Sequence, residues 1–358
     1  MRIKSIHLFD VGPHRGHREF NLGDNWQGGT NHLVLFSGPN GTGKSTVLRA
    51  IAYLWQMAGQ WLATPAVRPT GRSEARTWLR NNAAAVAILV DDVPGIGKSV
   101  GIYFGDEYLF SSIQPQAHFW MGELSGPHRP ASKSYLMHHD SSQWMWAWSQ
   151  AYKVLILSFE PSDPNGLPTP NLIYLDGEER RWVRPKGDPG KPIPDDPTKR
   201  WLVTYLPSED WSGQLEASLV TLKTLDEPSY LKVLTDLNAF LVGKFIRPQP
   251  TPALRLLVDV QDAQGTHNHP LDDLSAGERQ VLMQLYLVSR WLQTGGVVLL
   301  DEPDLHLHPS LVDPFVARLK ALVAERNGQL FLTSHSPMLW DYCEARGLRI
   351  KLGQGGEL

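Results

Sequence analysis

The chain has 358 residues, of which 42% are hydrophobic and 20% charged, so it can bury a large core and is not globally disordered. A formal net charge of −3 argues against a uniformly basic nucleic-acid-binding protein, although a local basic patch is compatible with it. The single cysteine, Cys343, excludes an internal disulfide framework and a cysteine-based zinc cluster. No apolar run approaches the roughly 20 residues that span a bilayer, and the N-terminus lacks a signal-peptide core. We therefore expect a soluble, cytoplasmic protein with no membrane partner.

The first sixty residues predict strands followed by a helix. Apolar and polar residues alternate over residues 3–8, and a second extended stretch covers residues 20–22. Residues 32–36 are nearly all apolar, as in a strand buried on both faces. A glycine-rich turn follows, and the apolar residues beyond it fall on one face of a predicted helix. Those residues are Val47, Leu48, Ile51, Leu54 and Trp55.

The middle of the chain carries shorter patterns. Asp176-Gly177 predicts a tight turn, which would pair the strand before it with residues 178–183 in a hairpin. Prolines between residues 185 and 197 predict an exposed loop, the best internal boundary. The tryptophan-rich segment 118–148 fits a docking surface and a packed core equally well. The apolar segments that predict strands in this region are 85–90, 100–104, 107–113, 153–159 and 171–175.

Regular patterns resume near Leu215 and are clearest in the last hundred residues. Helices are predicted near Leu215, over 229–242, over 275–293 and before Asn327. Strands are predicted over 254–260, 297–300 and 329–333. The final strand, helix and strand form a parallel α/β unit.

The strongest motif is Gly38-Pro39-Asn40-Gly41-Thr42-Gly43-Lys44-Ser45, which matches the phosphate-loop pattern G-x-x-x-x-G-K-[ST]. Its glycines let backbone N–H groups converge on phosphate oxygens, and the helix that begins there adds its positive end. We expect Lys44 to reach the β- and γ-phosphates and Ser45 to ligate Mg²⁺. The predicted nucleotide-binding residues of this loop are Asn40, Gly41, Thr42, Gly43, Lys44, Ser45 and Thr46.

A second motif places two carboxylates at the end of the apolar strand 297–300. The carboxyl ends of strands are where α/β sheets place their sites. We expect Asp301 to join the Mg²⁺ shell and Glu302 to polarise the attacking water.

The third motif is Leu274-Ser275-Ala276-Gly277-Glu278. Ser275 followed three residues later by Glu278 predicts a capping box at a helix start. The exposed N–H groups there can also hold a γ-phosphate, and the two interpretations are compatible.

The fourth motif is Thr333-Ser334-His335-Ser336-Pro337, which closely follows an apolar strand. Beside a phosphate loop and an acidic strand end, His335 becomes a candidate sensor of the γ-phosphate.

Two weaker patterns have structural explanations that we favour. The histidine pairs 138–139, 267 with 269, and 306 with 308 lack four ligands at zinc-like spacing. The basic stretch 180–186 contains a tryptophan and could contact nucleic acid, but neighbouring carboxylates also fit a solvated hairpin.

In type and in order, the four motifs resemble those of ABC-type ATPase heads. Within that superfamily, residues 301–309 and 333–337 are most similar to the stand-alone heads related to the overcoming-lysogenisation-defect, RecF and SMC proteins. The resemblance covers about residues 1–56 and 270–340. It implies an α/β P-loop fold with a mixed sheet and a helical signature lobe, ATP and Mg²⁺ as ligands, and Glu302 and His335 as catalytic residues.

The resemblance also implies a symmetric head-to-tail homodimer that holds two ATP molecules. Each nucleotide would lie on Lys44 of one copy and face Ser275 and Gly277 of the other. ATP binding would then stabilise the dimer, and hydrolysis would relax it.

Several features depart from the relatives. Heptads for a long coiled coil are not found, and only 23 residues follow His335, so we expect no TOPRIM nuclease. Gln114 is the candidate for the glutamine loop that adds a Mg²⁺ ligand. We expect a single head built from both chain ends, about 1–115 and 254–358, with an inserted lobe at about 116–253.

The resulting hypothesis is an ATP-hydrolysing switch that works with a separate effector, a nuclease or a toxin, in defence against phage. A RecF-like DNA repair ATPase is one alternative, with DNA as a further ligand. A transporter's nucleotide-binding subunit and a non-hydrolysing ATP-gated scaffold are the others.

Overall fold

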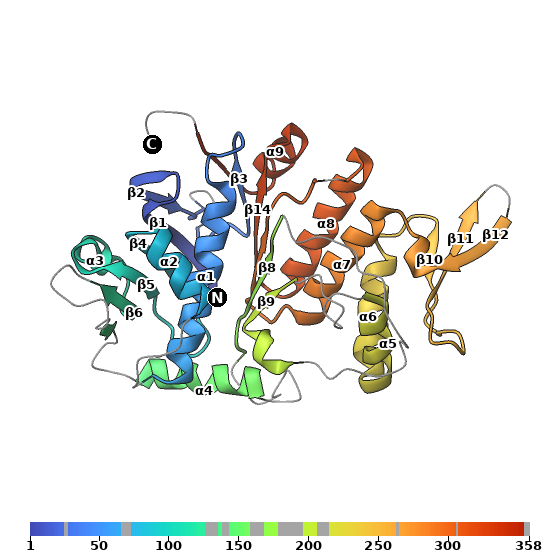
Figure 1. Cartoon of the computed structure of the whole chain (residues 1–358), viewed down its shortest axis with the longest axis horizontal. Coiled ribbons are helices and arrows are strands. Elements are labelled where there is room, and N and C mark those ends of the chain that lie inside the picture. The colour runs from blue at the N-terminus through green and yellow to red at the C-terminus, as the bar shows by residue number, and fades with distance from the viewer. Residues whose placement is uncertain are drawn as a thin grey trace.

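The computed structural model of the chain describes residues 1–24, 28–65, 73–125, 135–137, 143–157, 168–177, 196–205, 215–262, 265–305 and 307–353. These residues form two six-stranded sheets and one three-stranded sheet, with helices between and beside them (Figure 1). None of the described helices combines the length and the apolar character needed to cross a bilayer.

The central sheet is parallel throughout. Its strand order is β15-β3-β14-β13-β8-β9, and each neighbouring pair runs in the same direction. Every residue of β3, β13 and β14 is buried, which explains their continuous apolar sequences. Because the strands are parallel, their carboxyl ends and the loops that follow lie at one edge. The strand bounds are β3 Leu33–Ser37, β8 Leu172–Leu175, β9 Leu202–Thr204, β13 Val297–Leu300, β14 Gln329–Ser334 and β15 Leu348–Lys351.

The second sheet is formed mainly by the N-terminal third of the chain. Its order is β2-β1-β4-β5-β6-β7, and its pairs are antiparallel except β5 with β6. The bounds are β1 Arg2–Val11, β2 His14–Asn21, β4 Ala85–Asp91, β5 Val100–Asp106, β6 Phe119–Ser125 and β7 Tyr135–Met137.

Helix α1 (Lys44–Ala63) lies between these two sheets and shares one hydrophobic core with both (Figure 1). Trp55 of α1 stacks on Trp201, with ring centroids 4.2 Å apart. Each indole N–H donates to the other residue's carbonyl, at 3.0 and 2.8 Å. This double contact fastens the chain beside β9 to α1.

A second core covers the opposite face of the parallel sheet with helices from the C-terminal half. The helices are α5 Leu215–Leu225, α6 Glu227–Asn238, α7 Ala276–Trp291, α8 Pro309–Glu325 and α9 Pro337–Glu344. The small sheet β10 (Lys244–Ile246), β11 (Leu257–Asp262) and β12 (Gly265–Pro270) extends beyond them (Figure 1). The remaining helices are α2 Glu74–Asn82, α3 Glu107–Ile113 and α4 Gln143–Leu157, with short turns η1 Gln114–Gln116, η2 Pro197–Arg200 and η4 Leu271–Asp273.

Two predicted strands are helical, so these predictions were wrong. Residues 107–113 form α3, because the Asp106 side chain accepts from the Tyr108 N–H at 2.8 Å and caps a helix. Residues 153–157 belong to α4, where Trp144 and Trp148 are buried and Trp146 is 45% exposed. In α4 the apolar run packs as a helix face, and period alone does not separate a short buried helix from a strand. Residues 158–159, the predicted hairpin partner 178–183, the basic stretch 180–186 and His138, His139 and His306 lie outside the described residues.

Part of the expected inserted lobe pairs with strands of the head. Strands β8 and β9 fall within the range 116–253, yet they pair beside β13 and complete the parallel sheet. We propose that the head also includes residues 172–177 and 196–205. The pairing joins residues more than a hundred positions apart, and a local sequence pattern does not reveal such a pair.

Candidate nucleotide-binding site

The phosphate loop joins the end of β3 to the start of α1. Gly43 has φ +89°, and a Cβ there would collide with the ring of His14 and lie 2.7 Å from Pro13 Cγ, so only glycine fits. Helix α1 has no side-chain cap and no acidic residue in its first turn. Its first N–H groups and its positive end are therefore available to an anion.

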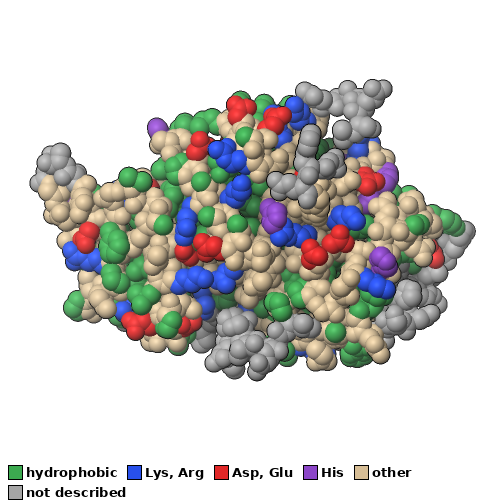
Figure 2. All heavy atoms as spheres, turned by 180° about the vertical axis from the view of Figure 1, so that it is seen from behind, with side chains coloured by type: hydrophobic (Ala, Val, Ile, Leu, Met, Phe, Trp, Pro, Cys, Tyr) green, Lys and Arg blue, Asp and Glu red, His purple; other side chains and the backbone are tan. Residues whose placement is uncertain are grey.

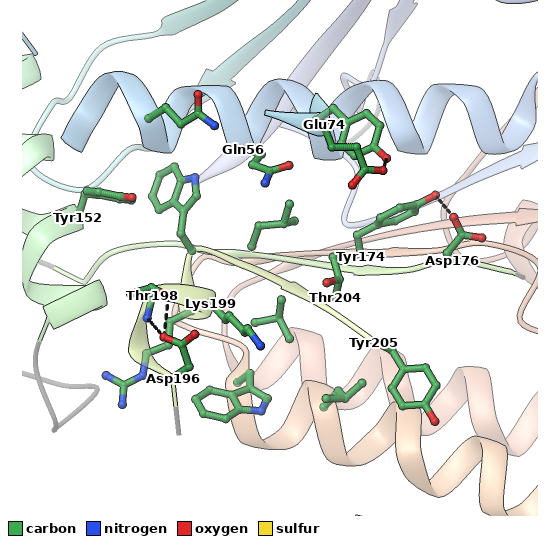
Figure 3. Close-up of a pocket in the computed structure, with 18 residues that line it drawn as sticks. Gln56, Glu74, Tyr152, Tyr174, Asp176, Asp196, Thr198, Lys199, Thr204 and Tyr205 are labelled. Carbon is green, nitrogen blue, oxygen red and sulfur yellow. Dashed lines mark hydrogen bonds between the residues drawn. The ribbon is translucent and has the colours of Figure 1, made fainter. Parts of the chain in front are cut away.

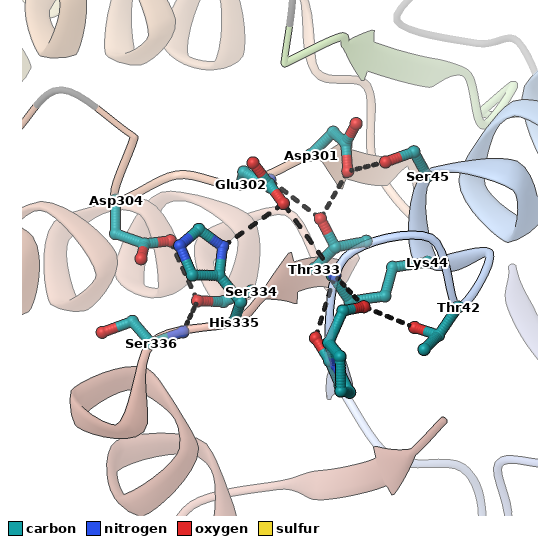
Figure 4. Close-up of polar contacts among 12 residues, drawn as sticks. Thr42, Lys44, Ser45, Asp301, Glu302, Asp304, Thr333, Ser334, His335 and Ser336 are labelled. Atoms are coloured by element: carbon teal, nitrogen blue, oxygen red, sulfur yellow. Dashed lines mark hydrogen bonds and ion pairs between the residues drawn. The ribbon is translucent and has the colours of Figure 1, made fainter. Parts of the chain in front are cut away.

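Lys44 is buried at the centre of the loop, with a side chain that is 4% exposed. Its Nζ donates to the carbonyl oxygens of Gly38 at 3.0 Å and Pro39 at 3.1 Å. The same atom lies 3.9 Å from Glu302 Oε1 (Figure 4). The loop thus already holds its lysine next to the acidic end of β13.

Asp301 follows β13 and receives two hydroxyl groups. Ser45 Oγ donates to Asp301 Oδ1 at 2.9 Å, and Thr333 Oγ1, from the end of β14, donates to the same oxygen (Figure 4). Burial raises the pKa of Asp301, the hydrogen bonds from Thr333 and Ser45 oppose this, and the charges of Asp176 and Glu302 add to the rise. A buried carboxylate beside two others and a serine hydroxyl is a hard-oxygen set that fits Mg²⁺.

Glu302 has a left-handed backbone, with φ +46°. A non-glycine residue rarely adopts this conformation, and such strain concentrates at functional sites. The Glu302 N–H donates to Thr333 Oγ1 at 2.8 Å. Its Oε1 lies 3.4 Å from His335 Nδ1, so this carboxylate stands between Lys44 and His335 (Figure 4).

Two residues that the sequence interpretation did not assign hold the loop of His335. Ser334 Oγ donates to Asp304 Oδ1 at 3.0 Å and accepts from the Ser336 N–H at 2.8 Å. Asp304 thereby ties the chain after β13 to the chain after β14. The available signal was the presence of polar residues just beyond two neighbouring parallel strands.

Asp176 is a third acidic residue at this edge, and the sequence interpretation placed it in a hairpin turn. Its Oδ2 accepts from the Tyr174 hydroxyl at 2.9 Å and from Arg49 Nη2 at 3.0 Å. A Cβ on the next residue, Gly177, would lie 3.3 Å from Asp301 Oδ2. The end of β8 therefore packs directly against Asp301.

Gln114, the candidate for the glutamine loop, is elsewhere. It lies in η1 after α3, where its carbonyl accepts from Trp120 Nε1 at 2.9 Å. It is next to β6 of the antiparallel sheet, whereas β8 borders β13 in the parallel sheet. Its role as the glutamine-loop residue stays a prediction.

The signature motif begins α7 as the predicted capping box. The Glu278 N–H donates to Ser275 Oγ at 3.3 Å, and the Ser275 N–H donates to Glu278 Oε2 at 3.0 Å. Lys244 Nζ lies 2.7 Å from Glu278 Oε1. Burial alone would raise the pKa of Glu278, but the bonds from Lys244 and Ser275 outweigh it and lower the pKa. In the described chain Ser275 bonds with Glu278 and Arg279 and not with the phosphate loop.

A cavity of about 600 Å³ lies on the β9 side of β8, between α1, β9 and α7 (Figure 3). Gln56 and Thr204 line it, together with Tyr53, whose hydroxyl donates to Glu74 at 2.9 Å. Burial and the adjacent Glu74 carboxylate raise the pKa of Tyr53 to about 12, which keeps this donor protonated at neutral pH. Asp176 also lines the cavity, so one residue borders both the cavity and the nucleotide edge.

Two family models and a curated protein match parts of the chain. Residues 195–341 match a family described as "AAA domain, putative AbiEii toxin, Type IV TA system", and residues 5–56 match a family described as "AAA domain". A 66-residue segment is 35% identical to protein ea59 of Escherichia phage lambda, and it spans 18% of this chain and 13% of that protein.

Solved structures with similar folds include two SMC heads. The SMC head domain from Thermotoga maritima is 14% identical, with 98% of this chain and 94% of that chain covered and a TM-score of 0.43. An SMC head bound to the C-terminal winged-helix domain of ScpA is 15% identical, with 95% and 92% covered and a TM-score of 0.45. A putative ABC transporter ATP-binding protein from Pyrococcus furiosus is 11% identical, with 97% of each chain covered and a TM-score of 0.35.

The two family models fall on the parts of the chain that build the parallel sheet and its loop edge. The model that matches residues 5–56 covers the phosphate loop, and the model that matches residues 195–341 covers the signature helix, the acidic strand end and His335. The chain therefore carries AAA-family domains over these residues, and its α/β fold and the order of its motifs are consistent with an ABC-type P-loop ATPase head.

Proposed function

We propose that the chain binds Mg-ATP at the loop edge of the parallel sheet and hydrolyses it between two copies arranged head to tail. The observation that carries this proposal is the position of Glu302. Its Oε1 lies 3.9 Å from Lys44 Nζ and 3.4 Å from His335 Nδ1, beside the Ser45–Asp301 pair. A carboxylate, a cation and a histidine around one space suit the activation of water next to a phosphate.

Each residue has a distinct task in this proposal. Lys44 and the N–H groups at the start of α1 bind the β- and γ-phosphates. Ser45 and Asp301 hold Mg²⁺, which when bound neutralises charge that develops on the phosphates. Glu302 orients the attacking water and accepts its proton. His335, bound to Glu302, responds to the γ-phosphate.

The second copy supplies Ser275 and Gly277. Among the described residues, the hydrogen bonds of Ser275 all go to Glu278 and Arg279 at the start of its own helix. A head-to-tail pair places the start of α7 on the open side of the nucleotide, so binding of ATP stabilises the dimer by mass action.

The substitution Glu302→Gln tests this function. It keeps the shape of the side chain and removes the base, so hydrolysis should fall by roughly 10²–10⁴-fold while ATP binding persists. Sedimentation with Mg-ATP should then show a long-lived dimer. Asp313→Asn, an exposed carboxylate on α8, is the control and should hydrolyse at the wild-type rate. A Glu302→Gln protein that hydrolyses normally, or that stays monomeric while it is saturated with Mg-ATP, contradicts the proposal.

We further propose that this ATP switch controls a separate effector protein, a nuclease or a toxin. The description of the matched family, which names a putative toxin of a type IV system, supports a role in defence. Co-purification of the Glu302→Gln protein with proteins made from adjacent genes tests this. Failure of each neighbour to bind either the ATP-bound or the nucleotide-free form contradicts it.

The face of the molecule that Figure 2 draws gives little support to a DNA ligand. Figure 2 shows Lys, Arg, Asp and Glu side chains interspersed over the face opposite to that of Figure 1, without a single-sign field. Binding to duplex DNA that requires ATP and weakens steeply with salt would favour the RecF-like alternative.

A further inference from the structure

Three potential metal ligands lie together on the antiparallel sheet, away from the phosphate loop. They are His7 on β1 and His17 and Glu19 on β2, and their ligand atoms all lie within 4.8 Å of one another. His7 pairs directly with Glu19, and Phe9 pairs with His17. Because alternate residues of a strand share a face, all three side chains project from the same side of the β1–β2 pair.

The spacing of the two imidazoles matches one shared ion. His7 Nδ1 and His17 Nε2 are 3.2 Å apart. Two nitrogens bound tetrahedrally to zinc at roughly 2.0–2.1 Å lie about 3.3 Å from each other. Glu19 Oε2 is 4.0 Å from His7 Nδ1, and its side chain is 43% exposed, so a small rotation brings it into range.

Neighbouring residues hold both rings in place. Ser5 Oγ and His7 Nε2 are hydrogen-bonded at 3.0 Å, which directs the other ring nitrogen of His7 toward the cluster. The ring of His17 stacks on Phe9, with centroids 4.2 Å apart and an interplanar angle of 7°. A partner on the second ring nitrogen and a fixed ring plane are typical of histidines that bind metals.

The three residues of the cluster differ in their exposure to solvent. His7 is fully buried, whereas His17 and Glu19 are exposed. An ion can therefore reach the cluster from solvent on the side of His17 and Glu19 and bind the buried His7 on the other side. Two imidazoles and one carboxylate suit Zn²⁺ and similar transition metals, while Mg²⁺ prefers oxygen ligands.

We propose that His7, His17 and Glu19 bind one transition-metal ion of the Zn²⁺ class and leave a fourth position to water. The ion would join the edge strand β2 to β1. The turn between these strands also contacts the phosphate loop, because His14 Nε2 lies 3.1 Å from the Gly43 carbonyl. Metal occupancy thus stiffens the hairpin that supports Gly43. The proposal does not depend on ATP hydrolysis.

The test uses the full chain, stripped of metal with a chelator and kept in excess Mg²⁺ to occupy oxygen-rich sites. Zn²⁺ is titrated in competition with a chromophoric chelator, and Co²⁺ reports coordination geometry by visible absorption. We expect one more tight equivalent in the wild type than in His17→Ala, and a tetrahedral Co²⁺ spectrum that His17→Ala lacks. Glu19→Gln should weaken Zn²⁺ binding roughly 10–100-fold.

Both substituted residues are exposed, so these variants should fold, and circular dichroism checks that they do. His118→Ala removes an exposed histidine outside the cluster and should bind Zn²⁺ like the wild type. Zinc should also raise the melting temperature of the wild type and of His118→Ala more than that of His17→Ala. Equal zinc stoichiometry, affinity and Co²⁺ spectra in the wild type and His17→Ala would overturn the proposal.

Discussion

Helices α1 and α7 both begin at a predicted phosphate contact, yet their N-termini are built differently. Helix α1 starts after Gly43 with no side-chain cap, no acidic residue in its first turn, and Lys44 beside it. Helix α7 starts with Ser275 and Glu278 in a reciprocal capping box. The first N–H groups of α1 are left for an external anion. In α7, the side chains of the capping box accept hydrogen bonds from some of the N–H groups at the helix start.

The same difference separates the two halves of the proposed ATP site. Around α1, Lys44, Glu302 and His335 already lie within 4 Å of their neighbours. Around α7, Ser275 bonds within its own helix. One half is assembled by the parallel sheet of a single chain, and the other half is a stable surface that needs a second chain to become part of the site.

The largest effect on nucleotide binding should come from Lys44→Ala, which removes the lysine at the uncapped start of α1. Losing charge-assisted bonds to phosphate costs about 1.5–3 kcal/mol, so nucleotide affinity should fall by roughly 10–100-fold or more. Fluorescent-nucleotide titration measures this. Lys232→Ala, an exposed lysine on α6, is the matched control and should bind normally. An unchanged affinity in Lys44→Ala would refute the phosphate-loop assignment.

A second substitution, Gly277→Asp, should affect hydrolysis and dimerisation but not nucleotide binding by the single chain. It changes the first turn of α7, which the capping box already stabilises. A Cβ there would make ordinary contacts with Leu311 and Leu307 at 3.4 and 3.5 Å, and an acidic residue in a first turn favours a helix. The isolated chain should therefore stay folded and bind nucleotide. In a dimer the new carboxylate would face a phosphate, and like charges in an interface cost several kcal/mol.

Hydrolysis and ATP-dependent dimerisation by Gly277→Asp should thus fall at least tenfold, as measured by phosphate release and sedimentation. Gly277→Ala is the comparison, because it adds the Cβ without the charge and should lose less activity. Wild-type hydrolysis by Gly277→Asp would remove α7 from the proposed site.

The smallest effect should come from Glu278→Gln, which weakens the capping box without touching α1. The lowered pKa of Glu278 means that its contribution to stability is present above the unfolded pKa, near about 4.3, and is lost as pH falls through the folded pKa. At pH 7 the variant should be about 1 kcal/mol less stable to urea. Between about pH 5 and pH 3 it should lose less stability than the wild type.

Glu325→Gln, an exposed carboxylate near the end of α8, provides the control and should change stability by less than about 0.5 kcal/mol. Parallel acid curves for the wild type and Glu278→Gln would show that the Lys244–Glu278–Ser275 contacts do not stabilise the fold.

The sequence predicts the part of the site in which polar residues directly follow apolar strands. The phosphate loop, Asp301, Glu302 and His335 each follow an apolar strand, so a parallel sheet brings them to one edge. Asp176 could not be found in this way, because the place of β8 beside β13 depends on a pairing across the fold and not on a local pattern.

Helix α3 was missed for a different reason. A single cap at Asp106 decides between helix and strand over seven residues of mixed composition. The cluster of His7, His17 and Glu19 depends on the register of β1 against β2, which spacing along the chain does not reveal.

The composite site is tested most directly by mixing two inactive proteins. Lys44→Ala lacks a working phosphate loop, and Gly277→Asp lacks a working signature. If each ATP lies between the loop of one copy and the signature of the other, a mixed dimer contains one intact site and one doubly damaged site. Random mixing before ATP is added should restore phosphate release to about a quarter of the wild-type rate. A mixture no more active than the sum of its two components would contradict the head-to-tail dimer.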